Sequence, residues 1–100
     1  MIKTMRGLKI ANKQRGFFFF DEKMMRIFDS IIETDLSVAG EVGFFVSSEK
    51  CRTTNTRLYT IRKALLDSGG IYGKGFEDSF RTLDEAKEEM ERQIEQEKEK

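Results

Sequence analysis

Residues 40–86 constrain the fold most strongly, because they hold three strand-forming segments followed by a helix start. In the first segment, Val42, Phe44 and Val46 occupy alternate positions, and a period of two is typical of a half-buried strand. The polar residues 48–56 that follow predict a turn. The middle of the chain is therefore expected to form an antiparallel sheet.

Residues 57–66 fit both a helix and a strand. Leu58, Ile61 and Leu65 are spaced as on one face of a helix. The run Tyr-Thr-Ile in the same segment and the hairpin-like sequence DSGG behind it favour a strand. We predict a strand over residues 58–63.

A helix that starts at Thr82 is the clearest local signal. Thr82 and Glu85 form a capping box of the S/T-x-x-E type. Apolar residues then recur at helical spacing, at Leu83, Ala86, Met90 and Ile94. Before this helix, residues 71–80 predict an irregular edge strand that two glycines weaken. After it, residues 95–100 are charged or polar, and we expect them to fray into solvent.

The N-terminal residues 1–15 combine basic side chains with isolated apolar ones. They predict either a loose strand or a mobile basic arm. Four consecutive phenylalanines follow, Phe17, Phe18, Phe19 and Phe20. One interpretation is a strand buried on both faces, because successive side chains of a strand point in opposite directions. In the other, one phenylalanine pair stays exposed as a docking surface, since exposed apolar patches often mark binding sites.

A second helix is expected to begin at Asp21. Asp21 is a candidate N-cap, and Glu22 follows in the first turn. Apolar residues recur at three- and four-residue spacing, at Met24, Met25, Phe28, Ile31 and Ile32. This pattern predicts an amphipathic helix to about Glu33.

Together these elements predict an α+β fold: a small antiparallel sheet of three to four strands with two helices packed against it, the C-terminal one amphipathic. We divide the chain into a basic arm over residues 1–15, a single domain over residues 16–94 and a charged tail over residues 95–100. The predicted core consists of Met25, Phe28, Ile31, Phe44, Val46, Tyr59, Ile61, Phe76, Leu83, Ala86 and Met90.

The composition limits the classes of function. The chain has 100 residues, 38% hydrophobic and 36% charged, which suits one small domain. It contains no histidine, which excludes the usual general base near pH 7 and every Ser-His or Cys-His nucleophile. Cys51 alone cannot form an internal disulfide, and no apolar run has the roughly 20 residues of a membrane span. We therefore expect a cytoplasmic protein without membrane contact, metal or cofactor.

No pattern of catalytic residues stands out. Gly69, Gly70, Gly73 and Gly75 lack the spacing of a phosphate-binding loop, so turn and bulge positions explain them better. The sequence RGFFFF matches the RNA-binding RNP1 pattern only in part, with Phe18 in place of Gly or Ala, and we reject that motif. Neighbouring carboxylates are ordinary on a solvated surface. We expect no enzymatic activity.

One basic stretch, residues 50–63, has a positive functional interpretation. It contains no acidic residue and five basic ones, Lys50, Arg52, Arg57, Arg62 and Lys63. Basic side chains around an aromatic such as Tyr59 suit phosphate contact and base stacking. The alternative is a surface strand that its charges protect against aggregation. We expect Arg57, Arg62 and Lys63 to lie at the surface and to be dispensable for folding.

Several short motifs occur in a characteristic order: FF and MMRIFDS in residues 19–30, GFFVSSE in 43–49, RLYTIRK in 57–63, GF in 75–76 and FRTLDEA in 80–86. This order resembles a small, functionally uncharacterised family that phages and integrated mobile elements carry. The resemblance implies a curled antiparallel sheet with a C-terminal helix, in which YTIR belongs to a central strand. It therefore supports the strand over residues 58–63, and it implies no activity.

Two non-enzymatic hypotheses follow. The first is a small binding protein of a phage or mobile element that binds a host protein in the host cytoplasm, for example as an inhibitor of a defence system. The alternative is a nucleic-acid-binding accessory protein that uses residues 50–63. The formal net charge of zero argues against general DNA binding, whereas the local basic stretches favour it. Four adjacent phenylalanines are hard to bury in one small domain, so we also predict a homodimer through residues 17–20.

Overall fold

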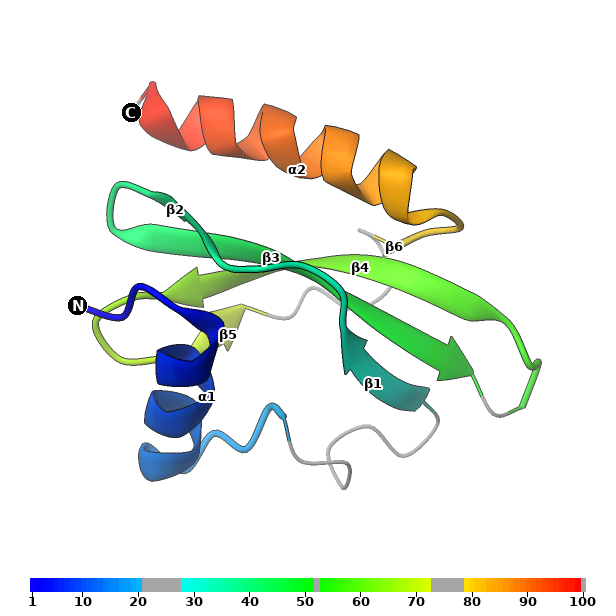
Figure 1. Ribbon diagram of the computed structural model, residues 1–100, viewed down its shortest axis with the longest axis horizontal. Helices are drawn as coiled ribbons and strands as arrows, with labels where there is room; N and C mark the ends of the chain where they lie inside the picture. The colour runs from blue at the N-terminus through cyan, green and yellow to red at the C-terminus, as the bar shows by residue number, and fades with distance from the viewer. Residues whose placement is uncertain (21–27, 52, 73–78, 100) are drawn as a thin grey trace.

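The structure, a computed structural model, describes residues 1–20, 28–51, 53–72 and 79–99. In that part of the chain, two helices enclose a series of antiparallel strands (Figure 1). The elements are α1 (Met5–Gln14), β1 (Phe28–Ile32), β2 (Ser37–Ala39), β3 (Val42–Cys51), β4 (Arg57–Leu65), β5 (Ile71–Tyr72), β6 (Ser79–Phe80) and α2 (Leu83–Lys98).

The strands β3 and β4 form the long central hairpin of the sheet, with Val46 opposite Ile61. β1 and β2 pair one after the other along the free edge of β3, and β5 and β6 pair along the free edge of β4. The described sheet is thus four strand positions wide. Gly69 in the turn after β4 has φ +81°, and a Cβ there would lie 2.8 Å from the Cβ of Ala11. Glycine is required because both the backbone conformation and the close approach of α1 exclude a side chain.

One face of the sheet packs against α2. Alternate residues of the two central strands point to this side, where Phe44, Val46 and Ile61 are buried together with Ala86 and Met90 of the helix. The helix spacing of Ala86 and Met90 places both side chains on one face of α2. In this layer, side chains from every second position of the strands pack against side chains four positions apart on the helix.

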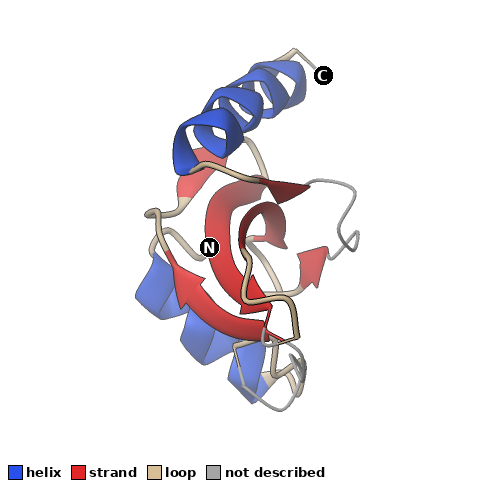
Figure 2. Ribbon diagram, turned by 90° about the vertical axis from the view of Figure 1, so that its right-hand side faces the viewer, coloured by secondary structure: helices blue, strands red, loops and turns tan. Residues whose placement is uncertain are grey.

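The opposite face packs against α1. Phe45 and Ala64 point to this side and are fully buried with Leu8 of the helix. Phe19 and Phe20 pack against the same cluster. Figures 1 and 2 show the two helices on opposite sides of the sheet, so the molecule has three layers.

The predicted fold class is confirmed: the protein is α+β, with a small antiparallel sheet and two helices. The strand over residues 58–63 is confirmed as part of β4. The start of α2 is confirmed too, because the N–H of Glu85 donates to Thr82 Oγ1 at 3.2 Å. The turn predicted for residues 48–56 is shorter than expected, since β3 continues to Cys51.

The prediction for residues 1–15 is wrong. They form neither a strand nor an arm, because residues 5–14 are the helix α1, which Thr4 caps by accepting a hydrogen bond from the N–H of Gly7 at 3.1 Å. Leu8 is fully buried against the sheet, and the N–H of Ile2 donates to the carbonyl of Leu66 at 2.9 Å. The N-terminal segment is therefore part of the packed domain.

Two further predictions fail between residues 16 and 33. Residues 17–20 form no strand: Phe17 and Phe18 have no regular secondary structure, and Phe19 and Phe20 lie in a turn. Phe18 adopts a positive φ of 54°. Of the helix expected from Asp21 to about Glu33, residues 21–27 lie outside the described residues, and residues 28–32 form strand β1 instead. Pairing of β1 with residues 47–51 of β3 prevails over the helical spacing in this segment.

The charged tail also differs from its prediction. α2 continues to Lys98, and Glu97 forms an ion pair with Lys63 at 3.1 Å, so the last turns are held to the sheet. In the predicted core, Phe44, Val46, Ile61, Ala86 and Met90 are buried, whereas Tyr59 and Leu83 are partly buried against them. The side chains of Met25, Phe28, Ile31 and Phe76 lie outside what the structure describes.

Candidate binding surface

The described basic residues predicted as a binding site do not all lie on one face of the sheet, since Lys50, Arg57 and Lys63 point to the α2 side and Arg62 points to the α1 side. Arg62 is only 7% exposed, and its guanidinium lies 3.1 Å from Glu49 Oε1 in a buried ion pair. Its Nε donates to Ser47 Oγ at 3.0 Å, and its guanidinium carbon lies 5.1 Å from the centre of the Phe19 ring. The expectation that Arg62 lies at the surface is therefore wrong, and its place in a buried ion pair favours a role in folding.

A buried polar network surrounds this ion pair on the α1 side of the sheet. Ser47 Oγ donates to Glu49 Oε1, and Thr60 Oγ1 donates to Glu49 Oε2 at 3.1 Å. The hydroxyls of Thr60 and Ser79 lie 3.1 Å apart. Both charges are thus satisfied by hydrogen bonds, which is the condition under which a buried ion pair is tolerated. We assign the network a structural role.

Two of the other predicted cations, Lys63 and Arg57, also make contacts within the protein. Lys63 pairs with Glu97 and lies 5.9 Å from the ring centres of Phe44 and Tyr72. Arg57 donates to the hydroxyl of Ser48. Lys50 is half-buried in β3, and Arg52 lies outside the described residues. Since Arg57 and Lys63 point to the α2 side and Arg62 to the α1 side, the structure does not bring the three together.

A different concentration of positive charge lies on α1. Five exposed basic residues occur in or beside this helix with no acidic residue in residues 1–20, namely Lys3, Arg6, Lys9, Lys13 and Arg15. Their three- and four-residue spacing places several of them on the outward face of the helix, together with the exposed Ile10. Within the described residues, no ion pair compensates the positive charge of this face.

The turn after α1 presents two phenylalanines to solvent next to these cations. Asn12 is buried, its Nδ2 donates to the carbonyl of Gly69 at 2.8 Å, and its Oδ1 accepts a hydrogen bond from the N–H of Phe19 at 2.7 Å. These bonds fix the turn to α1 and to the turn after β4. Phe17 and Phe18 remain 47% and 44% exposed. The positive φ of Phe18 is uncommon for a bulky residue and costs about 1–3 kcal/mol.

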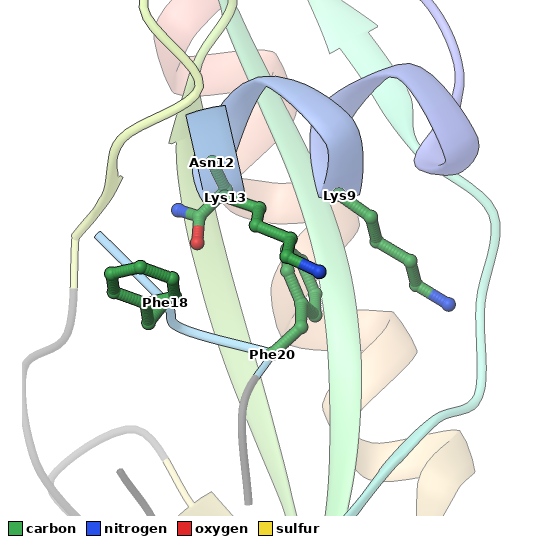
Figure 3. Close-up of a pocket in the computed structure, with 5 residues that line it drawn as sticks. All are labelled: Lys9, Asn12, Lys13, Phe18 and Phe20. Carbon is green, nitrogen blue, oxygen red and sulfur yellow. The ribbon is translucent and has the colours of Figure 1, made fainter. Parts of the chain in front are cut away.

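A cavity of about 230 Å³ lies between the helix and this turn (Figure 3). The described residues that line it are Lys9, Asn12, Lys13, Phe18 and Phe20. In Figure 3, Lys9 and Lys13 extend from α1 on the side of the Phe20 ring, and Lys13 lies between Phe18 and Lys9 in this view. The Nζ of Lys9 lies 5.9 Å from the centre of the Phe20 ring. The cavity thus combines apolar walls with a positively charged rim.

A second cavity, of about 360 Å³, lies on the other side of the turn. Its described lining is Asn12, Phe17, Phe19, Leu65, Gly70, Ile71 and Tyr72. Tyr72 is 53% exposed at the edge of the sheet. Its side chain points to the α2 side, because Tyr72 lies opposite Lys63 and its ring centre is 5.9 Å from Lys63 Nζ. We call the surface formed by Lys9, Ile10, Lys13, Phe17 and Phe18 the aromatic-basic surface.

Sequence reasoning found only part of this surface. One of the two interpretations of the four phenylalanines, an exposed pair, agrees with the exposure of Phe17 and Phe18, although the pair does not lie in a strand. The helix that supports the pair was missed. Thr4 as N-cap and the three-residue spacing of Met5 and Leu8 were the signals that could have found it.

Two negative observations apply to the described residues. None of their helices combines the length and the apolar character that crossing a membrane requires. They also contain no group of three or more acidic or cysteine side chains that could hold a metal ion.

Comparison of the sequence with curated proteins and comparison with solved structures each gave no match. Comparison with protein families did give one, over residues 4–91, which span α1, the whole sheet and the first half of α2. Because this match covers most of the chain, the protein belongs to the family of unknown function DUF7447.

Proposed function

We propose that this chain is a small, non-enzymatic binding protein that acts by contacting another protein through its aromatic-basic surface. The resemblance of its motifs to proteins of phages and mobile elements supports a partner from the host cell, such as a defence protein. The described surface offers two cavities with apolar walls and exposed cations beside one of them, which suit recognition of another macromolecule.

The exposure of Phe17 and Phe18 on an anchored turn is the observation that carries the proposal. Burying a phenylalanine side chain stabilises a protein by about 1.5–3 kcal/mol, and this turn forgoes nearly half of that gain at Phe17, which is 47% exposed, and at Phe18, which is 44% exposed. The backbone strain at Phe18 adds a further cost. Two hydrogen bonds of the buried Asn12 hold the turn in this conformation despite the exposed rings and the strained backbone. A partner that covers the rings would explain why the turn has this conformation.

The alternative, nucleic-acid binding through residues 50–63, has less support. Of its five cations, Arg62 and Lys63 are in ion pairs with Glu49 and Glu97, so phosphate binding would have to disrupt intramolecular contacts. We therefore place the partner on the opposite side of the sheet from α2, at the exposed face of α1.

Photo-crosslinking in host cells tests the proposal. A photoreactive benzoylphenylalanine replaces the exposed Ile10 in one variant and the exposed Lys87 on α2 in a matched control. We expect a protein adduct from position 10 that is absent from position 87. The same adduct should disappear when Phe17→Ser and Phe18→Gly are added.

Mass spectrometry of the adduct distinguishes the outcomes. A host protein would support the proposal, and an adduct with a second copy of this chain would support the predicted homodimer through residues 17–20 instead. An adduct that nuclease digestion removes would favour a nucleic acid. Identical adducts from positions 10 and 87, or none from either, would contradict the proposal.

A further inference from the structure

We infer that the aromatic-basic surface recognises a linear peptide segment that carries carboxylates at one end and large apolar side chains beyond them. The inference rests on the proposed function, because it names the chemistry of the protein partner. It follows from the size of the two cavities, from their arrangement around one turn, and from the charge on their walls.

The size of the cavities favours side chains as occupants. Pockets for whole small-molecule ligands typically measure about 300–1,000 Å³, and the first cavity, at about 230 Å³, lies below that range. The second, at about 360 Å³, lies at its lower end. Each cavity therefore suits a single large apolar side chain that belongs to a longer chain.

The positions of the two cavities relative to the turn after α1 favour an extended peptide as the ligand. Phe17 lines one cavity and its neighbour Phe18 lines the other, while Asn12 lines both. The two cavities thus flank the same turn, which two hydrogen bonds of Asn12 fix in place. A peptide that crosses the turn could place one side chain on each side of it, without any rearrangement of this protein.

The charge distribution decides between a peptide and a nucleic acid. Lys9 and Lys13 border the first cavity, and within the described part of the chain neither has an acidic partner. The described lining of the second cavity contains no charged residue. A nucleic-acid strand carries a phosphate at every nucleotide and requires cations along its whole length. A peptide with carboxylates only at the end near Lys9 and Lys13 matches the surface on both sides of the turn.

Display of a random library of 12-residue peptides on filamentous phage tests the inference. The targets are the wild-type protein, the Lys9→Glu/Lys13→Glu variant, the Phe18→Gly variant and Lys87→Glu as a charge control on α2. We expect the wild type and the control to enrich peptides in which Asp or Glu precedes or follows Phe, Tyr, Trp or Leu. Dissociation constants of synthesised peptides, measured by fluorescence anisotropy, should rise about ten- to a hundredfold with Lys9→Glu/Lys13→Glu.

The lysine variant separates this inference from the proposed function, whereas Phe18→Gly tests both. Glycine accepts the positive φ at this position, so the variant is expected to fold, which its melting temperature checks. Loss of peptide binding in both Phe18→Gly and the lysine variant supports the inference. Enriched peptides that lack carboxylates and ignore the lysine changes would overturn it but leave protein binding at this surface intact.

Two other results would also overturn the inference. The first is a wild-type protein that enriches no peptide. The second is a 12-nucleotide thymidine strand that binds more tightly than every selected peptide and loses affinity in the lysine variant. Peptides whose affinity is unchanged by Phe18→Gly would contradict both the inference and the proposed function.

Discussion

The two faces of the sheet are built in different ways. On the α2 side, alternating apolar residues of β3 and β4 meet one apolar face of an amphipathic helix. On the α1 side, the apolar contact around Phe45 and Leu8 is continuous with a buried ion pair, two anchored turns and exposed aromatic rings. The α2 side is thus a regular apolar layer between strands and a helix. The α1 side also contains buried charges and exposed aromatic rings.

This difference supports the position of the proposed binding surface. Regular apolar packing stabilises a fold without backbone strain. Strained backbone and exposed aromatic side chains lower stability, and proteins retain them mainly where a function requires them. Among the described residues, the exposed Phe17 and the strained, exposed Phe18 lie on the α1 side, whereas the exposed Tyr72 points to the α2 side. Asn55, with a φ of 59°, belongs to the β3–β4 turn. The α2 side is therefore the scaffold, and the α1 side carries the proposed binding surface.

The largest expected effects come from the two apolar centres, one on each face. Phe44→Ala and Phe45→Ala should each lower the free energy of unfolding by about 3–5 kcal/mol, because both rings are buried. Urea denaturation of the two variants measures this directly. If Phe45→Ala lowers the free energy of unfolding by less than about 1 kcal/mol, the α1 layer contributes little to stability. The two faces would then not both be apolar centres of the fold.

Removing one partner of the buried ion pair should have a comparable effect. Arg62→Met leaves Glu49 buried without its counterion, which typically costs about 3–5 kcal/mol. The double variant Glu49→Leu/Arg62→Met should recover most of that loss, since apolar replacements of a buried pair are often neutral or stabilising. The exposed pair of Arg92 and Glu89 is the control, where Arg92→Met should change stability by less than about 1 kcal/mol.

The helix caps provide an intermediate test of both layers. Thr4→Ala and Thr82→Ala each remove a side chain that accepts a hydrogen bond from the first helical turn. Each substitution should cost about 1 kcal/mol. Thermal melting compares them, and a negligible loss for Thr4→Ala alone would show that α1 is held by its packing rather than by its cap.

The smallest effect is expected at the turn of the binding surface. Phe18→Gly removes a large ring but also relieves a positive φ, so the free energy of unfolding should change by less than about 1 kcal/mol. Asn55→Gly, at φ 59° in the β3–β4 turn, is the matched control, because Asn tolerates this conformation better than Phe. A large loss of stability in Phe18→Gly would mean that the ring serves the fold rather than a partner.

The parts of the fold that could be predicted from sequence depend on local signals. Residues 42–47 alternate, and Thr82 and Glu85 form a capping box, so β3 and α2 could be placed without knowledge of their neighbours. The α2-side core was predicted for the same reason. Phe45 is absent from the predicted core and is fully buried, because α1 covers the second face of β3.

The parts that failed depend on contacts between distant segments. Residues 28–32 have helical spacing and form a strand only because the edge of β3 is available to pair with them. Arg62 stands among basic residues in the sequence, and its burial requires Glu49 on the neighbouring strand. Sequence reasoning proposed an exposed phenylalanine pair, but the supporting helix, the anchor Asn12 and the two cavities follow only from tertiary structure.

The placement of the helices on opposite sides of the sheet gives this protein an electric dipole. α1 and its flanks carry only basic charges, and in α2 the acidic residues outnumber the basic ones, although the whole chain has zero formal charge. In the field of an acidic partner, such a molecule rotates until its α1 side leads the approach. Productive encounters should therefore be faster at low ionic strength than the neutral composition suggests, and this advantage should fade as salt shortens the range of the field.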